Sequence, residues 1–164
     1  AHQTDGSQYF AKLILPTPQQ SRPTLFSFKA KAARDGWVGL GVHIFADQNK
    51  LKGYGFGDSL LVWLTRDRAY YGSDDTRLQL YRSDSAIRME QVLDALIEEG
   101  LHRWLDIDIY YQPIQEYITV FIDGEEKITY KTWFGISKGI EIAFRSLGEG
   151  IRFREPLVRT TYGK

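Results

Sequence analysis

The sequence predicts an all-β fold: a two-sheet antiparallel sandwich of the jelly-roll type, with one short helix at about residues 86–99. The first observation is the alternation of apolar and polar residues in several short segments, which is typical of half-buried strands. The second is that turn-forming residues separate these segments. The third is that strands and helices do not alternate along the chain, which argues against a parallel sheet.

The three clearest strands follow one another directly. They are expected at residues 104–111, 117–123 and 125–131. In the first, every second residue from Leu105 onward is apolar or aromatic, so one face of the strand is expected to be buried. Between the second and third, Asp123-Gly124 suits a two-residue hairpin turn, because such a turn needs residues that tolerate positive φ.

Seven further strands are separated by polar, glycine-rich or proline-containing segments. They are expected at residues 8–15, 24–33, 37–46, 58–66, 77–83, 140–146 and 151–159. Residues 58–66 are nearly all apolar, which predicts a central strand. Pro156 places the last strand at a sheet edge, or ends it, because proline cannot donate to the ladder.

The predicted helix rests on apolar residues at the spacing i, i+3, i+4, i+7 and i+8. They are Met89, Val92, Leu93, Leu96 and Ile97. Such a stripe is typical of one face of an amphipathic helix. Asp84 or Ser85 could cap its start, and Gly100 follows its end.

The length of 164 residues is enough for one domain with a sizeable core. Residues 1–7 are polar and are expected to be a loose N-terminal segment, which leaves 8–164 as a single β-sandwich domain. The chain begins with Ala-His rather than Met, which indicates a processed product and favours an extracytoplasmic location, periplasmic or secreted.

The charge balance argues against two classes of partner, although it leaves a local basic patch open. Lys+Arg and Asp+Glu are equal at 21 each, and this argues against a general nucleic-acid or anionic-membrane binder, because both need a basic surface. No run approaches 18 apolar residues, so no membrane span is predicted. The absence of cysteine rules out disulfides, thiolate nucleophiles and cysteine metal sites.

The order of these segments resembles the concanavalin A-like lectin/glucanase domains, including laminin-G-like domains. The residues that carry the resemblance are Trp37-Val38-Gly39-Leu40-Gly41-Val42, Trp104-Leu105-Asp106-Ile107-Asp108-Ile109, Ile118-Thr119-Val120-Phe121-Ile122-Asp123-Gly124, Ile140-Glu141-Ile142-Ala143-Phe144 and Phe153. The resemblance covers roughly residues 8–159. It implies a jelly-roll sandwich and a carbohydrate ligand on one sheet face, although some such domains are hydrolases. Fold alone does not fix function.

Alternation also predicts a ligand-binding face opposite the core, if the strands concerned are neighbours. Its expected residues are Trp37, His43, Trp63, Gln79, Tyr81, Asp106, Asp108 and Tyr110. Aromatic rings stack on the apolar face of a pyranose, and carboxylates and amides bind its hydroxyls. Gly39 and Gly41 leave space on this face, and Tyr54, in the glycine-rich segment 53–57, is expected at its edge. The alternative is that the helix covers this face, or that its tryptophans belong to a second core layer.

The sequence gives little support to a catalytic site. The glucanase motif Glu-x-Asp-x-x-Glu is absent, and the nearest pattern is Asp106-x-Asp108. Carboxylates at i and i+2 share a strand face roughly 6.5–7 Å apart, near the range of inverting glycosidases. Nothing in the sequence gives the two groups the distinct environments that an acid and a base need, so no catalytic residue is predicted.

Metal-ligand patterns are equally sparse. Asp74-Asp75, with Asp58, could bind calcium as some related lectin folds do, but no EF-hand spacing is present. The three histidines lack metal spacing, so no metal site or cofactor is predicted.

Three hypotheses of function follow. The first is a non-catalytic, lectin-like carbohydrate-binding domain of an exported protein, in which Trp37, Trp63 and Tyr81 stack on sugar. The second is a structural or protein-interaction module that uses an edge strand, the helix or the loop at Trp133. The third is a glycoside hydrolase that uses Asp106 and Asp108.

Overall fold

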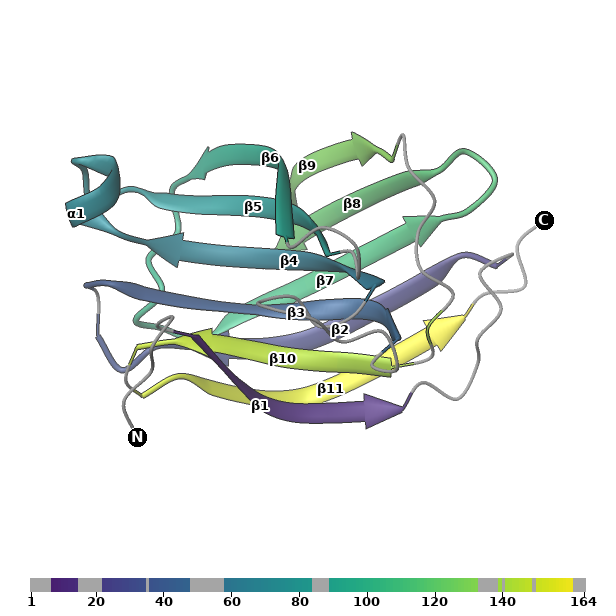
Figure 1. Cartoon of the computed structure of the whole chain (residues 1–164), viewed down its shortest axis with the longest axis horizontal. Helices are drawn as coiled ribbons and strands as arrows, with labels where there is room; N and C mark the ends of the chain where they lie inside the picture. The colour runs from purple at the N-terminus through teal and green to yellow at the C-terminus, as the bar shows by residue number, and fades with distance from the viewer. Residues whose placement is uncertain are drawn as a thin grey trace.

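The computed structural model describes residues 7–14, 22–34, 36–47, 58–83, 89–132, 139, 141–148 and 150–160. Within these ranges the chain forms eleven strands and one short helix. The strands make two antiparallel sheets that pack face to face, which confirms the predicted sandwich (Figure 1). No helix in this part of the chain is long and apolar enough to cross a membrane.

The first sheet has six strands in the order β1-β10-β3-β4-β5-β6. Their bounds are β1 Ser7–Ile14, β10 Glu141–Leu147, β3 Val38–Asp47, β4 Asp58–Arg66, β5 Thr76–Ser83 and β6 Met89–Ile97. The second sheet has five strands in the order β11-β2-β7-β8-β9. Their bounds are β11 Arg152–Thr160, β2 Thr24–Lys31, β7 Leu105–Gln112, β8 Tyr117–Ile122 and β9 Glu125–Lys131.

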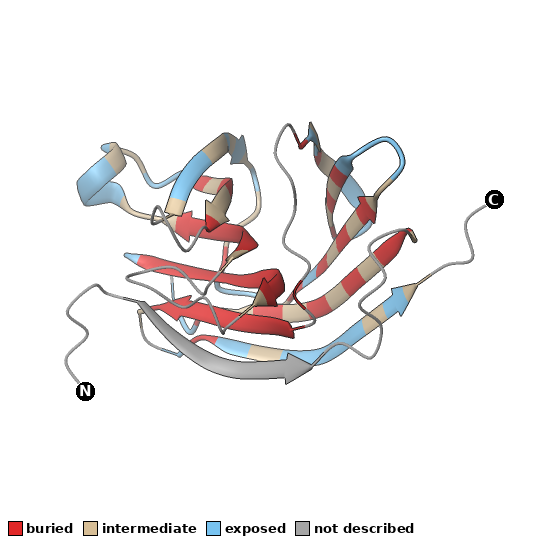
Figure 2. Ribbon diagram, turned by 45° about the vertical axis from the view of Figure 1, so that its right-hand side comes forward, coloured by how far each residue is buried: buried red, intermediate tan, exposed pale blue. Residues whose placement is uncertain are grey.

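One apolar layer fills the space between the two sheets, as the alternation predicts. In Figure 2, buried segments follow the strands of both sheets. The inward-facing aliphatic residues of β3, β4, β5 and β7 all belong to one buried cluster. Aromatic rings join the layers, because Phe26 of β2 meets Phe45 of β3 edge to face at 5.2 Å between ring centroids. Phe28 meets Phe144 of β10 in the same way at 5.3 Å.

The predicted helix at 86–99 is wrong, because residues 89–97 form the edge strand β6. The pairing of β6 with β5 shifts register between Leu80 and Tyr81, which pair with Leu93 and Gln91, so Val92 is an extra residue. Such a bulge breaks the period of two and places adjacent apolar residues against the core. The resulting pattern imitates the spacing of an amphipathic helix.

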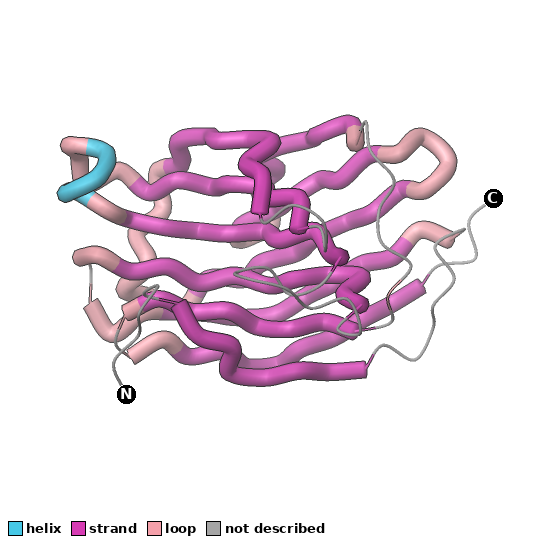
Figure 3. Tube along the Cα trace, in the orientation of Figure 1, coloured by secondary structure: helices cyan, strands magenta, loops and turns pink. Residues whose placement is uncertain are grey.

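The one short helix of the described chain is α1, Arg68–Tyr71, at one end of the molecule between β4 and β5 (Figure 3). Asp67 caps it, because its Oδ1 accepts a hydrogen bond from the Tyr70 backbone N–H at 3.0 Å. Gly72 ends it in the left-handed conformation with φ 74°, which glycine adopts at little cost.

The indole of Trp63 on β4 lies across the neighbouring strand β3, over two glycines. A Cβ atom added to Gly39 would lie 2.1 Å from Trp63 Cζ2, and one added to Gly41 would lie 2.9 Å from Trp63 Cε3. Trp63 is therefore only 8% exposed, and it packs with Leu61 and Leu147 in a small apolar cluster on the outward face of the sheet. This indole fills the space beside Gly39, whereas the nearest atom to a Cβ at Gly41 is the backbone oxygen of Val62, at 2.1 Å.

We predict that Gly39→Ala lowers the free energy of unfolding by about 1–3 kcal/mol, the usual cost of forcing an extra carbon into a packed site. In a Trp63→Ala background the same change should be neutral or stabilising, because the nearest atoms to the new Cβ belong only to the indole. Urea unfolding of the four proteins measures this coupling. An equal cost in both backgrounds would show that the indole does not fill the space above Gly39.

Candidate functional site

The outward face of the six-stranded sheet carries a hollow of about 350 Å³ beside α1. We call it the aromatic hollow. It is lined by Trp37, Trp63, Thr65, Asp67, Tyr70, Tyr71, Gln79, Tyr81, Gln91 and Leu147. The sheet register explains how these residues meet, because Trp63 pairs with Gln79 and Tyr81 pairs with Gln91 across neighbouring strands.

A buried amide organises the floor of the aromatic hollow. Gln79 is 1% exposed. Its Nε2 donates to Tyr71 Oη at 2.7 Å and to Asp94 Oδ1 at 3.1 Å, while its Oε1 accepts from Tyr81 Oη at 2.8 Å. Both amide protons are used, so Gln79 positions the two tyrosines instead of offering a free donor to a ligand.

The rim of the aromatic hollow is formed by exposed rings. Trp37, just before β3, is 61% exposed, and Tyr70 on α1 is 78% exposed. The ring of Tyr71 meets Tyr70 edge to face at 4.8 Å and lies under the guanidinium of Arg77 at 4.1 Å. Arg77 is itself paired with Asp94 at 2.6 Å, which holds this stack in place.

The hydroxyl of Tyr81 stays protonated over the physiological range. Burial raises the pKa of Tyr81 to about 12, and the neighbouring Tyr71 and Asp94 add to the effect. Its proton lies between two acceptors, Gln79 Oε1 at 2.8 Å and Gln91 Oε1 at 3.0 Å. This hydroxyl is therefore a fixed, uncharged group of the hollow.

His43 lies on the same face of the sheet but is fully buried. Its Nδ1 is 2.8 Å from Ser59 Oγ, and its Nε2 is 3.4 Å from Nη1 of Arg145, which also donates to Met89 Sδ at 3.2 Å. Burial lowers the pKa of His43 well below its usual range, and the positive charge of Arg145 lowers it further. In this structure His43 is a neutral residue below the surface that does not line the aromatic hollow.

The expectation that Asp106, Asp108 and Tyr110 share a face with Trp63 is wrong. They lie on β7, which belongs to the five-stranded sheet, and they face away from the core that the two sheets share. The sequence shows which residues of a strand face outward, but not which sheet contains the strand. The predicted edge residue, Tyr54, lies outside the described residues, as does the loop at Trp133.

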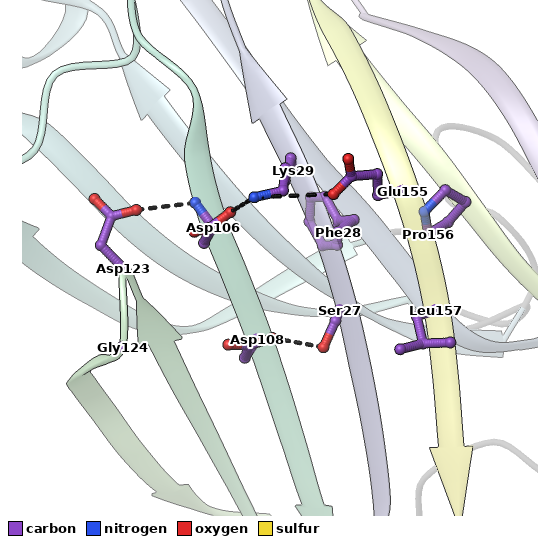
Figure 4. Close-up of a pocket in the computed structure, with 10 residues that line it drawn as sticks. All are labelled: Ser27, Phe28, Lys29, Asp106, Asp108, Asp123, Gly124, Glu155, Pro156 and Leu157. Atoms are coloured by element: carbon purple, nitrogen blue, oxygen red, sulfur yellow. Dashed lines mark hydrogen bonds and ion pairs between the residues drawn. The ribbon is translucent and has the colours of Figure 1, made fainter.

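A second hollow, of about 710 Å³, lies on the outward face of the five-stranded sheet (Figure 4). It contains Asp106 and Asp108, which point toward β2. Lys29 Nζ lies 2.5 Å from Asp106 Oδ1 and 3.8 Å from Glu155 Oε2. The hydrogen bond with Asp106 raises the pKa of Lys29 above its usual value.

This second hollow lacks the features of a glycosidase centre. Asp106 pairs with Lys29, and Asp108 Oδ1 accepts from Ser27 Oγ at 2.5 Å. Each carboxylate is held by a polar side chain of β2, whereas an acid and a base need two distinct environments. The geometry thus gives the two carboxylates similar roles, in ion pairing and hydrogen bonding across β2 and β7.

The candidate calcium residues also have other roles. Asp74 pairs with Arg68 at 3.3 Å, and Asp74 and Asp75 are exposed. No group of three His, Cys, Asp or Glu residues with metal-binding geometry occurs among the residues that the structure describes. Calcium binding remains an untested expectation.

Sequence reasoning missed part of the aromatic hollow. Tyr70, Tyr71 and Gln91 line it, yet the first two fall between the strands expected at 58–66 and 77–83, and the third falls in the expected helix. The pair of aromatic residues before Gly72, between two buried strands, was a sequence signal that could have indicated Tyr70 and Tyr71 as site residues. Gln91 could be found only with β6 placed beside β5.

No profile of a known protein family matches the chain, and no curated protein matches it. Solved structures do match. The carbohydrate-binding module CBM66 from Bacillus subtilis is 7% identical, with a TM-score of 0.61 over 95% of this chain and 83% of that one. Sheep galectin-11 in complex with glycerol is 10% identical, with a TM-score of 0.59 over 93% and 95%.

The galectin LEC-6 of Caenorhabditis elegans is 9% identical, with a TM-score of 0.59 over 97% and 99% of the two chains. At these identities the likeness shows the fold alone. The chain therefore has the concanavalin A-like jelly-roll fold that the order of its strands predicts.

We predict that buried His43 makes the protein sensitive to acid. The neutral native residue resists protonation, whereas the unfolded residue binds a proton near pH 6.5, so stability is fully present above that pH and falls below it. The slope contributed is at most about 1.4 kcal/mol per pH unit. His43→Gln should flatten the loss between pH 7 and 5, and His102→Gln, at an exposed histidine, should retain it.

Proton NMR of the wild-type protein gives a second measurement that needs no variant. The ring signals of His43 should keep their neutral shifts while the protein is folded. Ordinary titration of His43 near pH 6.5 in the folded state would contradict its burial.

Proposed function

We propose that this chain is a non-catalytic carbohydrate-binding domain whose ligand occupies the aromatic hollow. The observation that carries the proposal is the convergence of five aromatic side chains around one buried amide network. They are Trp37, Trp63, Tyr70, Tyr71 and Tyr81. Rings of this kind stack on the apolar face of a pyranose, and phenol hydroxyls and amides bond to its hydroxyl groups.

The names of three proteins with similar folds support this proposal: one is a carbohydrate-binding module and two are galectins. A hollow of about 350 Å³ falls at the small end of the range for small-molecule sites, which fits one or two sugar rings. An extracytoplasmic location, where glycans are abundant, accords with the proposal and stays a prediction.

In this proposal, several residues have roles other than those that the sequence suggested. Trp37 and Tyr70 are the rings that a sugar can reach, while Trp63 forms the floor and is 8% exposed. Gln79 acts as a positioning residue. Asp106 and Asp108 stand on the other sheet and are left out of the proposed site.

The lining of the aromatic hollow accords with binding without catalysis. Its one carboxylate, Asp67, caps α1, and nearby Asp94 accepts bonds from Arg77 and Gln79. A hydrolase of this type needs two carboxylates on either side of the scissile bond, one of them protonated. The hollow does not offer such a pair.

The interaction-module hypothesis has less support. The helix on which it partly relied is strand β6. Leu96 on β6 and Ile114 in the β7–β8 turn are exposed apolar residues on elements of different sheets, and single residues of this kind are normal on a protein surface.

We predict that Trp37→Ala and Tyr70→Ala each weaken glycan binding by about tenfold, which corresponds to about 1.4 kcal/mol of lost stacking and contact. Both residues are exposed, so the melting temperature should change little. A glycan array identifies the ligand, and calorimetry on the isolated chain then measures Kd. Trp104→Ala, the same change as Trp37→Ala but on the opposite face, is the matched control and should bind as the wild type does.

Full binding by the Trp37→Ala, Tyr70→Ala double variant would exclude the aromatic hollow as the site. A folded protein that binds no glycan on a broad array would overturn the proposed function itself.

A further inference from the structure

We infer that the aromatic hollow selects an uncharged sugar, and that the hydroxyl proton of Tyr71 is a determinant of that selectivity. This inference rests on the proposed function, because it names the class of glycan that the same hollow would bind.

The charges at the hollow favour an uncharged ligand. Among the described residues that line the hollow, none is a lysine, arginine or histidine. The guanidinium of Arg77 stacks on Tyr71 at 4.1 Å and is paired with Asp94 at 2.6 Å. Arg145, whose charge acts on Tyr81, is buried beside His43. An anionic sugar would lose hydration here without a cation to compensate, which is costly. The carboxylate of Asp67 would repel it as well.

The hollow also offers a ligand one hydrogen-bond donor, the hydroxyl of Tyr71. Tyr71 Oη accepts from Gln79 Nε2 at 2.7 Å, so its own proton has to point elsewhere. Among the described residues, none accepts this proton. The phenol borders an open hollow, and a donor left without a partner there is available to an oxygen atom of a ligand.

The hollow offers a hydrogen-bond acceptor as well, the side-chain oxygen of Gln91. The single proton of Tyr81 lies between Gln79 Oε1 and Gln91 Oε1, so one of these two oxygens is left without it. Gln79 is buried and Gln91 is exposed, so Gln91 is the residue that a ligand can reach. A sugar hydroxyl is both donor and acceptor, and two hydroxyls of one ring match an acceptor at Gln91 and a donor at Tyr71.

The ring of Tyr71 is also fixed before a ligand arrives. It is held by Tyr70 at one edge, by Arg77 over its face and by Gln79 at its hydroxyl. A donor that is already oriented loses little conformational entropy on binding, so its hydrogen bond contributes more to affinity and selectivity.

The test begins with the neutral oligosaccharide that the array identifies and its counterpart oxidised to a uronate at C6. Calorimetry should show the neutral sugar binding the wild-type chain at least about tenfold more tightly, with a Kd that changes little with added salt. Gln91→Lys places a cation at the hollow and should narrow or reverse this preference, with an affinity for the uronate that falls as salt rises.

The role of Tyr71 is tested with Tyr71→Phe and a set of monodeoxy analogues of the neutral sugar. The variant should bind the parent sugar about fivefold more weakly, as expected for one hydrogen bond of about 1 kcal/mol. One deoxy analogue should bind wild type and variant equally, because it lacks the oxygen that Tyr71 contacts. Tyr110→Phe, the same change on the five-stranded sheet, should leave the whole series unaltered.

The outcomes separate the two claims. Tighter binding of the uronate by wild type, or a loss in Tyr71→Phe that is equal for every analogue, overturns this inference but leaves carbohydrate binding in place. The absence of binding to any glycan overturns the proposed function.

Discussion

The structure depends on a single apolar layer that two sheets have to share. Each strand gives alternate residues to this layer, and its other residues face outward on one side of the sandwich or the other. Sheet membership therefore decides which outward residues can act together. Trp63, Gln79 and Tyr81 meet because β4 and β5 are neighbours, whereas Asp106 and Asp108 lie on the far side because β7 joins the other sheet.

On the outward face of the six-stranded sheet, one packing interaction leads to the next. The glycines of β3 allow the Trp63 indole to lie flat, and this indole forms the floor of the aromatic hollow beside the Gln79 amide. The amide in turn fixes the hydroxyls of Tyr71 and Tyr81. Polar and aromatic groups held this firmly need little reordering on binding, which is how a shallow surface hollow can acquire selectivity.

Local patterns were enough to predict the sandwich and its core, because alternation from Leu105 to Tyr111 and the Asp123-Gly124 turn report directly on backbone geometry. Local patterns gave a wrong prediction where strand pairing is irregular, because the extra residue Val92 gave β6 the apolar spacing of a helix. The composition of the site was half predictable. Local periodicity does not show which strands pair with each other. Strand pairing places Gln91 at the hollow and places Asp106 on the other sheet.

The central claim is that a glycan binds the outward face of the six-stranded sheet. Its most direct test is backbone amide chemical-shift mapping by NMR during titration with a neutral glycan identified by array. The largest shifts should cluster at Trp37, Tyr70, Tyr71 and Gln91. Shifts concentrated instead around Asp106, in the hollow on the five-stranded sheet, would contradict it and place the site on the opposite face.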